Sequence, residues 1–308
     1  MTDFRSGFIA ILGRPNVGKS TLTNALLGQK VAAVSPKPQT TRRRQLGILT
    51  TDSYQMVFVD TPGIHAARHK LGEFLNQEAR ESLDGVDAIL WLVDVTTPPS
   101  EDDERIASLL PRRTPLVLGL NKIDLVHADV LSTRREAYAA KVRKDAHVVT
   151  FSAARGNGLV DLLSLLVSFL PVRAAEFDPE QVTDLYEKEI AADLIREAAL
   201  NHLRDEVPHG VAVRIDEFKE RENGMAYIAA TIFVERDSQK GIVIGEGGKM
   251  LKSIGSAART EIEAMGGRRV FLEVRVKVLK DWRNDDEWLK RFGYKVKRKK
   301  YLLYKDFE

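Results

Sequence analysis

The stretch GRPNVGKS, Gly13–Ser20, decides the fold of this 308-residue chain. It matches the pattern G-x-x-x-x-G-K-[ST], in which a glycine-rich turn wraps phosphate groups and a helix begins directly after the turn. The apolar run Phe8–Leu12 precedes it and predicts a strand, while Lys19–Leu27 follows with a helical pattern. A strand, a glycine turn and a helix in this order predict a P-loop, and therefore an α/β nucleotide-binding domain.

The P-loop residues have separate expected roles. Backbone N–H groups turn inward around the phosphates, and the start of the following helix adds a positive dipole end. Lys19 is expected to reach the β- and γ-phosphates, and the Ser20 hydroxyl to ligate magnesium. The expected nucleotide contacts in this part of the chain are Gly13, Arg14, Pro15, Asn16, Val17, Gly18, Lys19, Ser20 and Thr21.

Three further motifs, each at the end of a predicted strand, indicate that the base is guanine. DTPG at Asp60–Gly63 offers a carboxylate to the magnesium shell and a backbone N–H to the γ-phosphate. In NKID at Asn121–Asp124, the last carboxylate can accept both N–H donors of guanine, a pattern that adenine lacks. FSA at Phe151–Ala153 can offer a backbone N–H to the guanine carbonyl. The expected contacts are Asp60, Thr61, Pro62, Gly63, Asn121, Lys122, Asp124, Ser152 and Ala153.

The segment PKPQTTRRRQLG, residues 36–47, lies between the P-loop and DTPG. Two prolines, two threonines and three arginines predict an exposed loop. A threonine here can close onto magnesium when the γ-phosphate is present, and we prefer Thr41 over Thr40 for this role. The expected metal ligands are Ser20, Thr41 and Asp60, and the expected catalytic groups are Lys19, Thr41 and Gly63.

Apolar runs and helical patterns alternate through the first 170 residues or so of the chain. Runs such as AILWLV are apolar on both faces, which predicts a mostly parallel sheet with helices on both sides. We therefore expect a P-loop GTPase domain over residues 1–172, a proline-containing linker over 173–183 and a second domain over 184–308. In the second domain we expect the order helix, strand, strand, helix, strand, helix, followed by a basic tail.

The second domain carries its own glycine motif. VIGEGGKMLKSIG at Val243–Gly255 contains G-x-x-G ahead of a basic amphipathic helix, the arrangement in which KH domains clamp a single-stranded RNA backbone. An α+β fold of the type II KH class suits the expected order of elements. The expected RNA contacts are Gly245, Glu246, Gly247, Gly248, Lys249 and Lys252, with Lys297, Arg298, Lys299 and Lys300 in the tail. Trp288 and Phe292, at helical spacing, are expected to pack on the sheet rather than to stack bases.

Composition narrows the function further. The chain contains no cysteine, which excludes a thiolate metal site, a cysteine nucleophile and a disulfide framework. The last stretch, Lys240–Glu308, has 18 basic and 10 acidic residues, which favours a polyanionic partner. No apolar stretch reaches the roughly 18 residues of a membrane span. We expect a cytoplasmic monomer, with peripheral contact to anionic lipids through the tail left open.

The motif order GxxxxGKS, TT, DTPG, NKxD and SA resembles the Era and MnmE type of GTPases, and PQTTR and DTPGIH are especially similar to the Era type. The resemblance covers the whole chain. It implies GTP/GDP and Mg²⁺ as cofactors, and binding to the 3′ region of small-subunit ribosomal RNA during assembly of the small ribosomal subunit. Two alternatives stay open: an RNA chaperone whose hydrolysis is not coupled to RNA, and a membrane-associated signalling GTPase.

The resemblance also has one consequence for hydrolysis. Ile64 follows DTPG where Ras-like GTPases carry a glutamine that orients the attacking water, so a slow intrinsic rate is implied. Asn16 matches an asparagine that coordinates potassium in some MnmE-like relatives, which makes K⁺ a candidate second cation. A stabilised turn is the alternative role for Asn16. His65 is expected to be an ordinary loop residue rather than a catalytic base.

Overall fold

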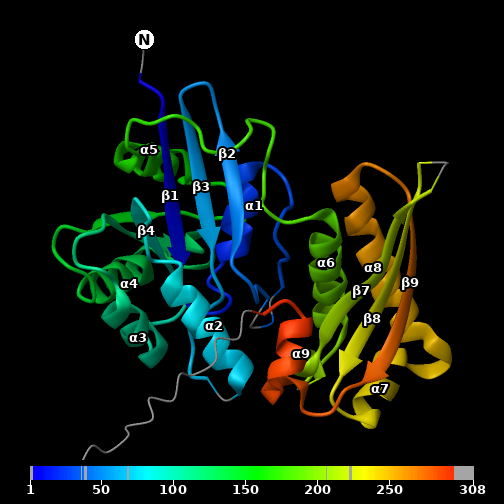
Figure 1. Cartoon of the computed structure of the whole chain (residues 1–308). Helices are drawn as coiled ribbons and strands as arrows, with labels where there is room; N and C mark the ends of the chain where they lie inside the picture. The colour runs from blue at the N-terminus through cyan, green and yellow to red at the C-terminus, as the bar shows by residue number, and fades with distance from the viewer. Residues whose placement is uncertain are drawn as a thin grey trace, which may run out of the picture.

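The computed structural model describes residues 3–35, 37, 40–67, 69–205, 207–221 and 224–294 (Figure 1). The predicted tail contacts Lys297, Arg298, Lys299 and Lys300 lie outside the described residues. Two sheets organise the described chain, one of six strands and one of three.

The larger sheet has the order β2-β3-β1-β4-β5-β6, in which only β2 runs antiparallel to its neighbour β3 among the described strands. Its strands are β1 (Arg5–Leu12), β2 (Gln45–Thr50), β3 (Tyr54–Asp60), β4 (Ala88–Asp94), β5 (Leu116–Asn121) and β6 (His147–Thr150). The mostly parallel arrangement predicted from the sequence is confirmed. Because the parallel strands point the same way, the motifs that follow β1, β3 and β5 meet at one edge of the sheet.

Helices cover both faces of this sheet. They are α1 (Lys19–Leu27), α2 (Lys70–Glu81), α3 (Glu101–Leu109), α4 (Ala128–Ala139) and α5 (Leu159–Phe169). Ile9 and Ile11 of β1 belong to the core formed with α1 and α5, while Ala10 and Leu12 belong to the core formed with α2, α3 and α4. Alternate residues of one strand are therefore buried on opposite faces, which explains why the apolar run is continuous.

The smaller sheet has the order β7-β8-β9, with β7 antiparallel and β9 parallel to β8. Its unit consists of α6 (Glu187–His202), β7 (Ala212–Glu220), β8 (Ala226–Val234), α7 (Asp237–Ile244), α8 (Lys249–Gly266), β9 (Val270–Val278) and α9 (Asp286–Arg291). The predicted order lacked α7. This helix has eight residues and contains Gly241, so its helical periodicity is too short to recognise.

The smaller sheet is covered differently on its two faces. On one face, Ile228 and Ile232 pack with residues of α6 and α8, such as Leu194 and Ile254. On the other, Phe233 packs with Leu71 and Leu75 of α2, and with residues of α9 and the turn before it. Phe233 also contacts the rings of Trp288 and Phe292, with centroids 6.1 and 5.3 Å away. The expectation that these two aromatics pack on the sheet is confirmed.

The segment predicted as a linker is tied to the larger sheet at several points. The Arg173 side chain donates to the Ser6 carbonyl at 2.8 Å, and the Ile48 N–H donates to the Val182 carbonyl at 2.9 Å. The Gln55 side chain donates to the Phe177 carbonyl at 2.9 Å. The chain between the two sheets therefore runs against β1, β2 and β3 before α6 begins.

Among the helices that the structure describes, none combines the length and the apolarity that crossing a bilayer requires.

Candidate nucleotide site and nucleic-acid groove

The P-loop has a backbone that only certain residues adopt easily. Asn16 and Gly18 have φ angles of 65° and 102°, and α1 begins at the next residue, Lys19. A Cβ atom on Gly18 would lie 2.4 Å from the Nδ2 atom of Asn121. Glycine is therefore required here both for the backbone conformation and for the close approach of the NKID motif.

Lys19 is held inside this turn. Its ammonium group donates to the carbonyl oxygens of Gly13 and Arg14, at 3.1 and 3.0 Å. Burial lowers the pKa of Lys19 to about 8, and the nearby carboxylate of Asp60 opposes that shift. A polyanion bound in the loop would favour the charged form of Lys19, and the charged Lys19 would in turn stabilise the polyanion.

The three predicted metal ligands come together at the start of α1. The Ser20 and Thr41 hydroxyl oxygens are 2.8 Å apart, and they lie 3.1 and 3.3 Å from the Oδ2 atom of Asp60. Burial raises the pKa of the Asp60 carboxyl group, against the attraction of Lys19. Its Oδ1 atom is buried without a hydrogen-bond partner in the described part of the chain. One carboxylate and two hydroxyls suit a magnesium ion that takes its remaining ligands from phosphate and water.

Thr40 and Thr41 have different surroundings. The Thr40 hydroxyl donates to the Lys37 carbonyl at 2.9 Å, within its own loop, whereas Thr41 faces Ser20 and Asp60. This placement favours Thr41 as the magnesium ligand. The same loop is less exposed than its composition predicted, since the Arg42 side chain is buried at 4% exposure against the smaller-sheet unit. The expectation of a wholly exposed loop is wrong at this residue because backbone carbonyls satisfy the guanidinium.

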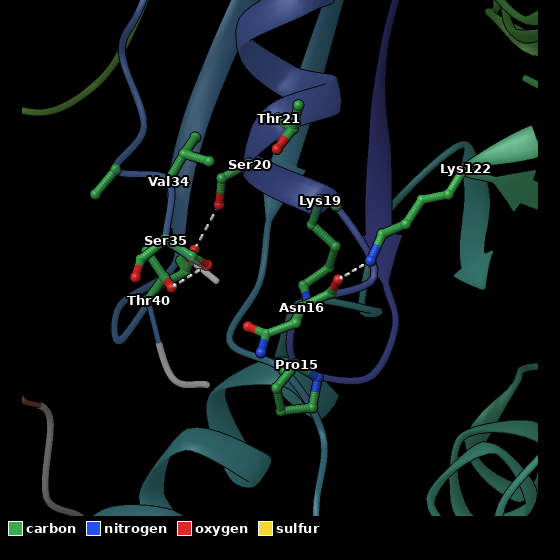
Figure 2. Close-up of a pocket in the computed structure, with 13 residues that line it drawn as sticks. Pro15, Asn16, Lys19, Ser20, Thr21, Val34, Ser35, Thr40 and Lys122 are labelled. Carbon is green, nitrogen blue, oxygen red and sulfur yellow. Dashed lines mark hydrogen bonds between the residues drawn. The ribbon is translucent and has the colours of Figure 1, made fainter. Parts of the chain in front are cut away.

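Figure 2 shows the cavity in front of the P-loop, with Ser20 and Thr40 on one side and Asn16 and Lys19 on the other. The cavity has a volume of about 300 Å³. It is lined by Pro15, Asn16, Gly18, Lys19, Ser20, Thr21, Ala33, Val34, Ser35, Thr40, Thr41, Gly63 and Lys122. Ala33, Val34 and Ser35 were not predicted, because nothing in their side chains points to nucleotide chemistry.

Several predicted contacts do not line this cavity, and four of them have side chains that are bound or buried elsewhere in the protein. Arg14 reaches the buried carboxylate of Asp103 at 3.0 Å, and the Thr61 hydroxyl donates to the Ile11 carbonyl at 2.7 Å. Val17 is a core residue at 2% exposure, and Pro62 is buried as well. The side chains of these four residues are therefore held within the protein.

The NKID and FSA motifs meet beside the P-loop. The Asn121 side chain donates to the Val17 carbonyl at 2.8 Å and accepts from the Ala153 N–H at 2.9 Å. Lys122 donates to the Asn16 carbonyl at 2.9 Å, as the dashed line in Figure 2 marks, and pairs with Asp94 at 2.5 Å. Asn121 and Lys122 thus fix the NKID and FSA motifs to the P-loop.

Asp124 and Ser152 belong to the two motifs that were predicted to recognise the base. Asp124 lies in a short 3-10 turn, Ile123–Leu125, with an exposed carboxylate. The Ser152 hydroxyl is buried and accepts from the Arg155 N–H at 3.1 Å, which shapes the FSA loop. The cavity lining includes Lys122 but not Asp124, Ser152 or Ala153.

DTPG touches the P-loop directly. A Cβ atom on Gly63 would lie 2.6 Å from the Pro15 nitrogen, and the Ile64 N–H donates to the Gly13 carbonyl at 3.3 Å. Ile64 is 3% exposed and packs in the core under the sheet, so it offers the site no polar group. The His65 ring nitrogen lies 2.9 Å from the Gly63 carbonyl, so the ring contacts the backbone of the DTPG motif.

The G-x-x-G motif forms a glycine turn between α7 and α8. Gly245, Gly247 and Gly248 have positive φ angles of 71°, 58° and 78°. A Cβ atom on Gly245 would lie 2.7 Å from Met250, while the space above Gly247 and Gly248 is open. The turn therefore presents bare backbone at the entrance of α8, with Glu246 and Lys249 exposed beside it.

A groove of about 400 Å³ continues from this turn along α8 and β9. It is lined by Gly248, Leu251, Lys252, Gly255, Ser256, Arg259, Leu272 and Val274. Lys252 was predicted, whereas Ser256 and Arg259 were missed. Their signal was available, because they follow Lys252 at i+4 and i+7 on one helical face. The groove combines an apolar floor with cationic edges, as unpaired nucleotides require.

Comparison with known proteins finds a matching family for each of the two parts of the chain. Residues 8–122 match the family described as 50S ribosome-binding GTPase, and residues 206–283 match the KH domain family. The chain is 46% identical to GTPase Era of Ruminiclostridium cellulolyticum, over 96% of this chain and 99% of that relative. It is 47% identical to GTPase Era of Geobacter metallireducens, over 94% of this chain and 98% of that relative.

Two solved structures resemble the whole fold. One is Era in complex with MgGDPNP and nucleotides 1506–1542 of 16S ribosomal RNA, with a TM-score of 0.91 and 38% identity over 95% of this chain and 100% of that one. The other is an Aquifex aeolicus Era variant bound to GDP and AlF4⁻, with a TM-score of 0.90 and 38% identity, covering 95% of this chain and 100% of that one. The predicted fold, a P-loop GTPase domain followed by a KH domain, is confirmed.

Proposed function

This chain belongs to the Era family of GTPases, and we propose that it uses its GTP cycle to control binding to single-stranded RNA from the 3′ region of small-subunit ribosomal RNA. The protein binds and hydrolyses GTP. Its proposed role is in assembly of the small ribosomal subunit, in the cytoplasm and as a monomer. The observation that carries the RNA proposal is the groove along α8, which continues from bare glycine backbone and is lined by Lys252 and Arg259.

For the nucleotide, we propose the contacts predicted from the four motifs. Lys19 neutralises the β- and γ-phosphates, the Gly63 N–H meets the γ-phosphate, and Asp124 selects guanine. Ser20, Thr41 and Asp60 would hold magnesium, which supplies charge neutralisation at the phosphates. The support for this assignment is the close approach of the three oxygen groups and the unsatisfied Oδ1 atom of Asp60.

For potassium, the proposal rests on Asn16, whose side chain faces the cavity from a turn with positive φ (Figure 2). Phosphate release should be faster in potassium than in sodium, and Asn16→Ala should remove the difference. Equal rates for the wild-type protein in both salts would end this part of the proposal.

For the domains, we propose a GTPase domain over residues 1–172, a linker over 173–183 and a KH domain over 184–308. The two sheets fall within the first and last of these ranges. The structure of an Era relative with RNA favours coupled RNA binding over the two alternatives, an uncoupled chaperone and a membrane signalling GTPase. Contact of the tail with phosphates or with anionic lipids stays a prediction.

Filter binding tests the RNA proposal. The probes are an RNA of the small-subunit 3′ region and an RNA of the same composition in scrambled order. The 3′-region RNA should bind more tightly, and Gly247→Asp should abolish binding because its side chain places a carboxylate in open space where phosphates must approach. GTP affinity should stay unchanged in that variant. Equal binding of Gly247→Asp and wild type would refute the KH groove as the RNA site.

A further inference from the structure

We propose that the KH domain positions Thr41 for GTP hydrolysis. Arg196 of α6 holds the residue before Thr41, and the Val211 and His209 carbonyls hold the residue after it. The inference rests on the proposed function, because it takes Thr41 as the magnesium ligand. It assigns a positioning role in the GTPase reaction to residues that lie far along the chain from every GTPase motif.

The residue before Thr41 is held by α6. Arg196 donates from its Nη2 atom to the Thr40 carbonyl oxygen, and the same nitrogen lies 3.5 Å from the Asp193 carboxylate. The Arg196 side chain is 5% exposed. A buried guanidinium has a strong requirement for acceptors, so this contact resists separation. The Thr40 carbonyl is thereby fixed with respect to the KH domain.

The residue after Thr41 is held by a second part of the same domain. The Arg42 guanidinium donates to the Val211 carbonyl at 2.8 Å and to the His209 carbonyl at 3.2 Å. It also lies over the Trp282 ring, 5.6 Å from its centroid. Arg42 is as buried as Arg196, and that burial lowers its pKa to about 10. Thr41 is therefore bracketed by two buried arginine contacts, both made across the boundary between the domains.

The start of the same loop is also bound to α6. Glu197, the neighbour of Arg196, accepts from the Val34 N–H at 3.0 Å and from the Lys30 ammonium at 2.8 Å. One helix thus contacts the segment between α1 and β2 at Val34 and again at Thr40. Thr41 directly follows the second of these contacts, so the position of its hydroxyl depends on the docking of the KH domain.

The consequence is specific to the GTP state. A threonine that closes on magnesium does so with the γ-phosphate in place, so loss of its support should affect GTP hydrolysis and not GDP binding. Arg196→Ala in the full chain should lower kcat roughly tenfold or more, the effect of removing one charge-assisted hydrogen bond. It should also raise the Mg²⁺ concentration for half-maximal hydrolysis, with GDP affinity unchanged. Arg196→Lys, which keeps a cationic donor, should recover much of the loss.

The control is Lys70→Ala. Lys70 of α2 pairs with Asp286 of α9 at 3.0 Å, which is also a contact between the domains, but it is half-exposed and distant in sequence from Thr41. This variant should hydrolyse GTP as the wild type does. If Arg196→Ala does not fold, Arg196→Met serves in its place, because it keeps the aliphatic stem while removing the donor.

A double-mutant cycle with Thr41→Ala decides the matter. If Arg196 acts through Thr41, adding Arg196→Ala to Thr41→Ala should change kcat less than twofold. The proposal would be overturned if the double variant lost kcat by the product of the two single losses. It would also be overturned if Arg196→Ala matched Lys70→Ala in kcat and in Mg²⁺ requirement. If Thr41→Ala alone leaves hydrolysis intact, the assignment of Thr41 fails instead, so the two failures are distinguishable.

Discussion

Replacing Asp124 by asparagine should change which base the protein binds without changing how stable it is. The Asp124 carboxylate is exposed in the short turn after β5, where it is free to meet the base edge. Guanine presents two N–H donors to it, and asparagine can accept only one of them. Losing a charge-assisted pair costs about 1.5–3 kcal/mol, which corresponds to roughly ten- to hundredfold weaker GTP binding.

The Asp124→Asn variant should bind xanthosine triphosphate more tightly than the wild type does. In that nucleotide a carbonyl replaces the guanine amino group, so an asparagine side chain can donate to it while accepting from the ring N–H. Calorimetric titration with GTP and with xanthosine triphosphate measures both changes in affinity. The free energy of unfolding, followed by thermal denaturation, should change by less than about 0.5 kcal/mol, as for other exposed sites.

A matched control is Asp129→Asn, the same chemical change at an exposed position in the first turn of α4. Asp129→Asn should change neither the affinity for GTP nor that for xanthosine triphosphate. The reasoning fails if Asp124→Asn binds GTP as tightly as wild type, or if Asp129→Asn weakens GTP to the same extent.

Two further predictions concern residues inside the site. Asn121→Ala should destabilise the protein by roughly 2–4 kcal/mol and weaken GTP, since it leaves the buried Val17 carbonyl and Ala153 N–H unpaired; an unchanged melting temperature would contradict this. GTP binding should take up a proton at pH 8.5 and much less at pH 7, because the Lys19 pKa is about 8 before the phosphates raise it. Above that pKa the affinity should therefore fall with rising pH, and calorimetry in buffers of different ionisation enthalpy that finds no uptake at pH 8.5 would refute the assignment.

The local chemistry of the GTPase domain was predictable from the sequence. The P-loop dictates a helix from its lysine onward, and Lys19–Leu27 is the helix that the structure has. The apolar runs gave the strands to within a few residues, because strands buried on both faces have no polar interruptions. Placing the motifs at strand ends predicted that Ser20 and Asp60 lie together, and the loop between the P-loop and DTPG added Thr41, without any knowledge of distances.

Contacts between distant segments could not be predicted in the same way. Arg42 belongs to a polar, proline-containing stretch, and the sequence alone indicated an exposed loop. It is buried because carbonyls of Val211 and His209, about 170 residues later, satisfy its guanidinium. No periodicity or motif records such a pairing. For the same reason Arg196 and Glu197 looked like ordinary charged positions of an amphipathic helix.

The most direct test of the account is the affinity of the full-length protein for the 3′-region RNA in two nucleotide states. Fluorescence anisotropy of the labelled RNA, at one fixed salt concentration, would be measured with a non-hydrolysable GTP analogue and with GDP. If the GTP cycle controls the KH groove, the two dissociation constants should differ at least fivefold, the lower end of typical coupling between two sites. RNA should then shift the affinity for the analogue relative to GDP by the same factor. Equal RNA affinity in both states would contradict the central claim, and would leave GTP as a ligand that does not regulate RNA binding.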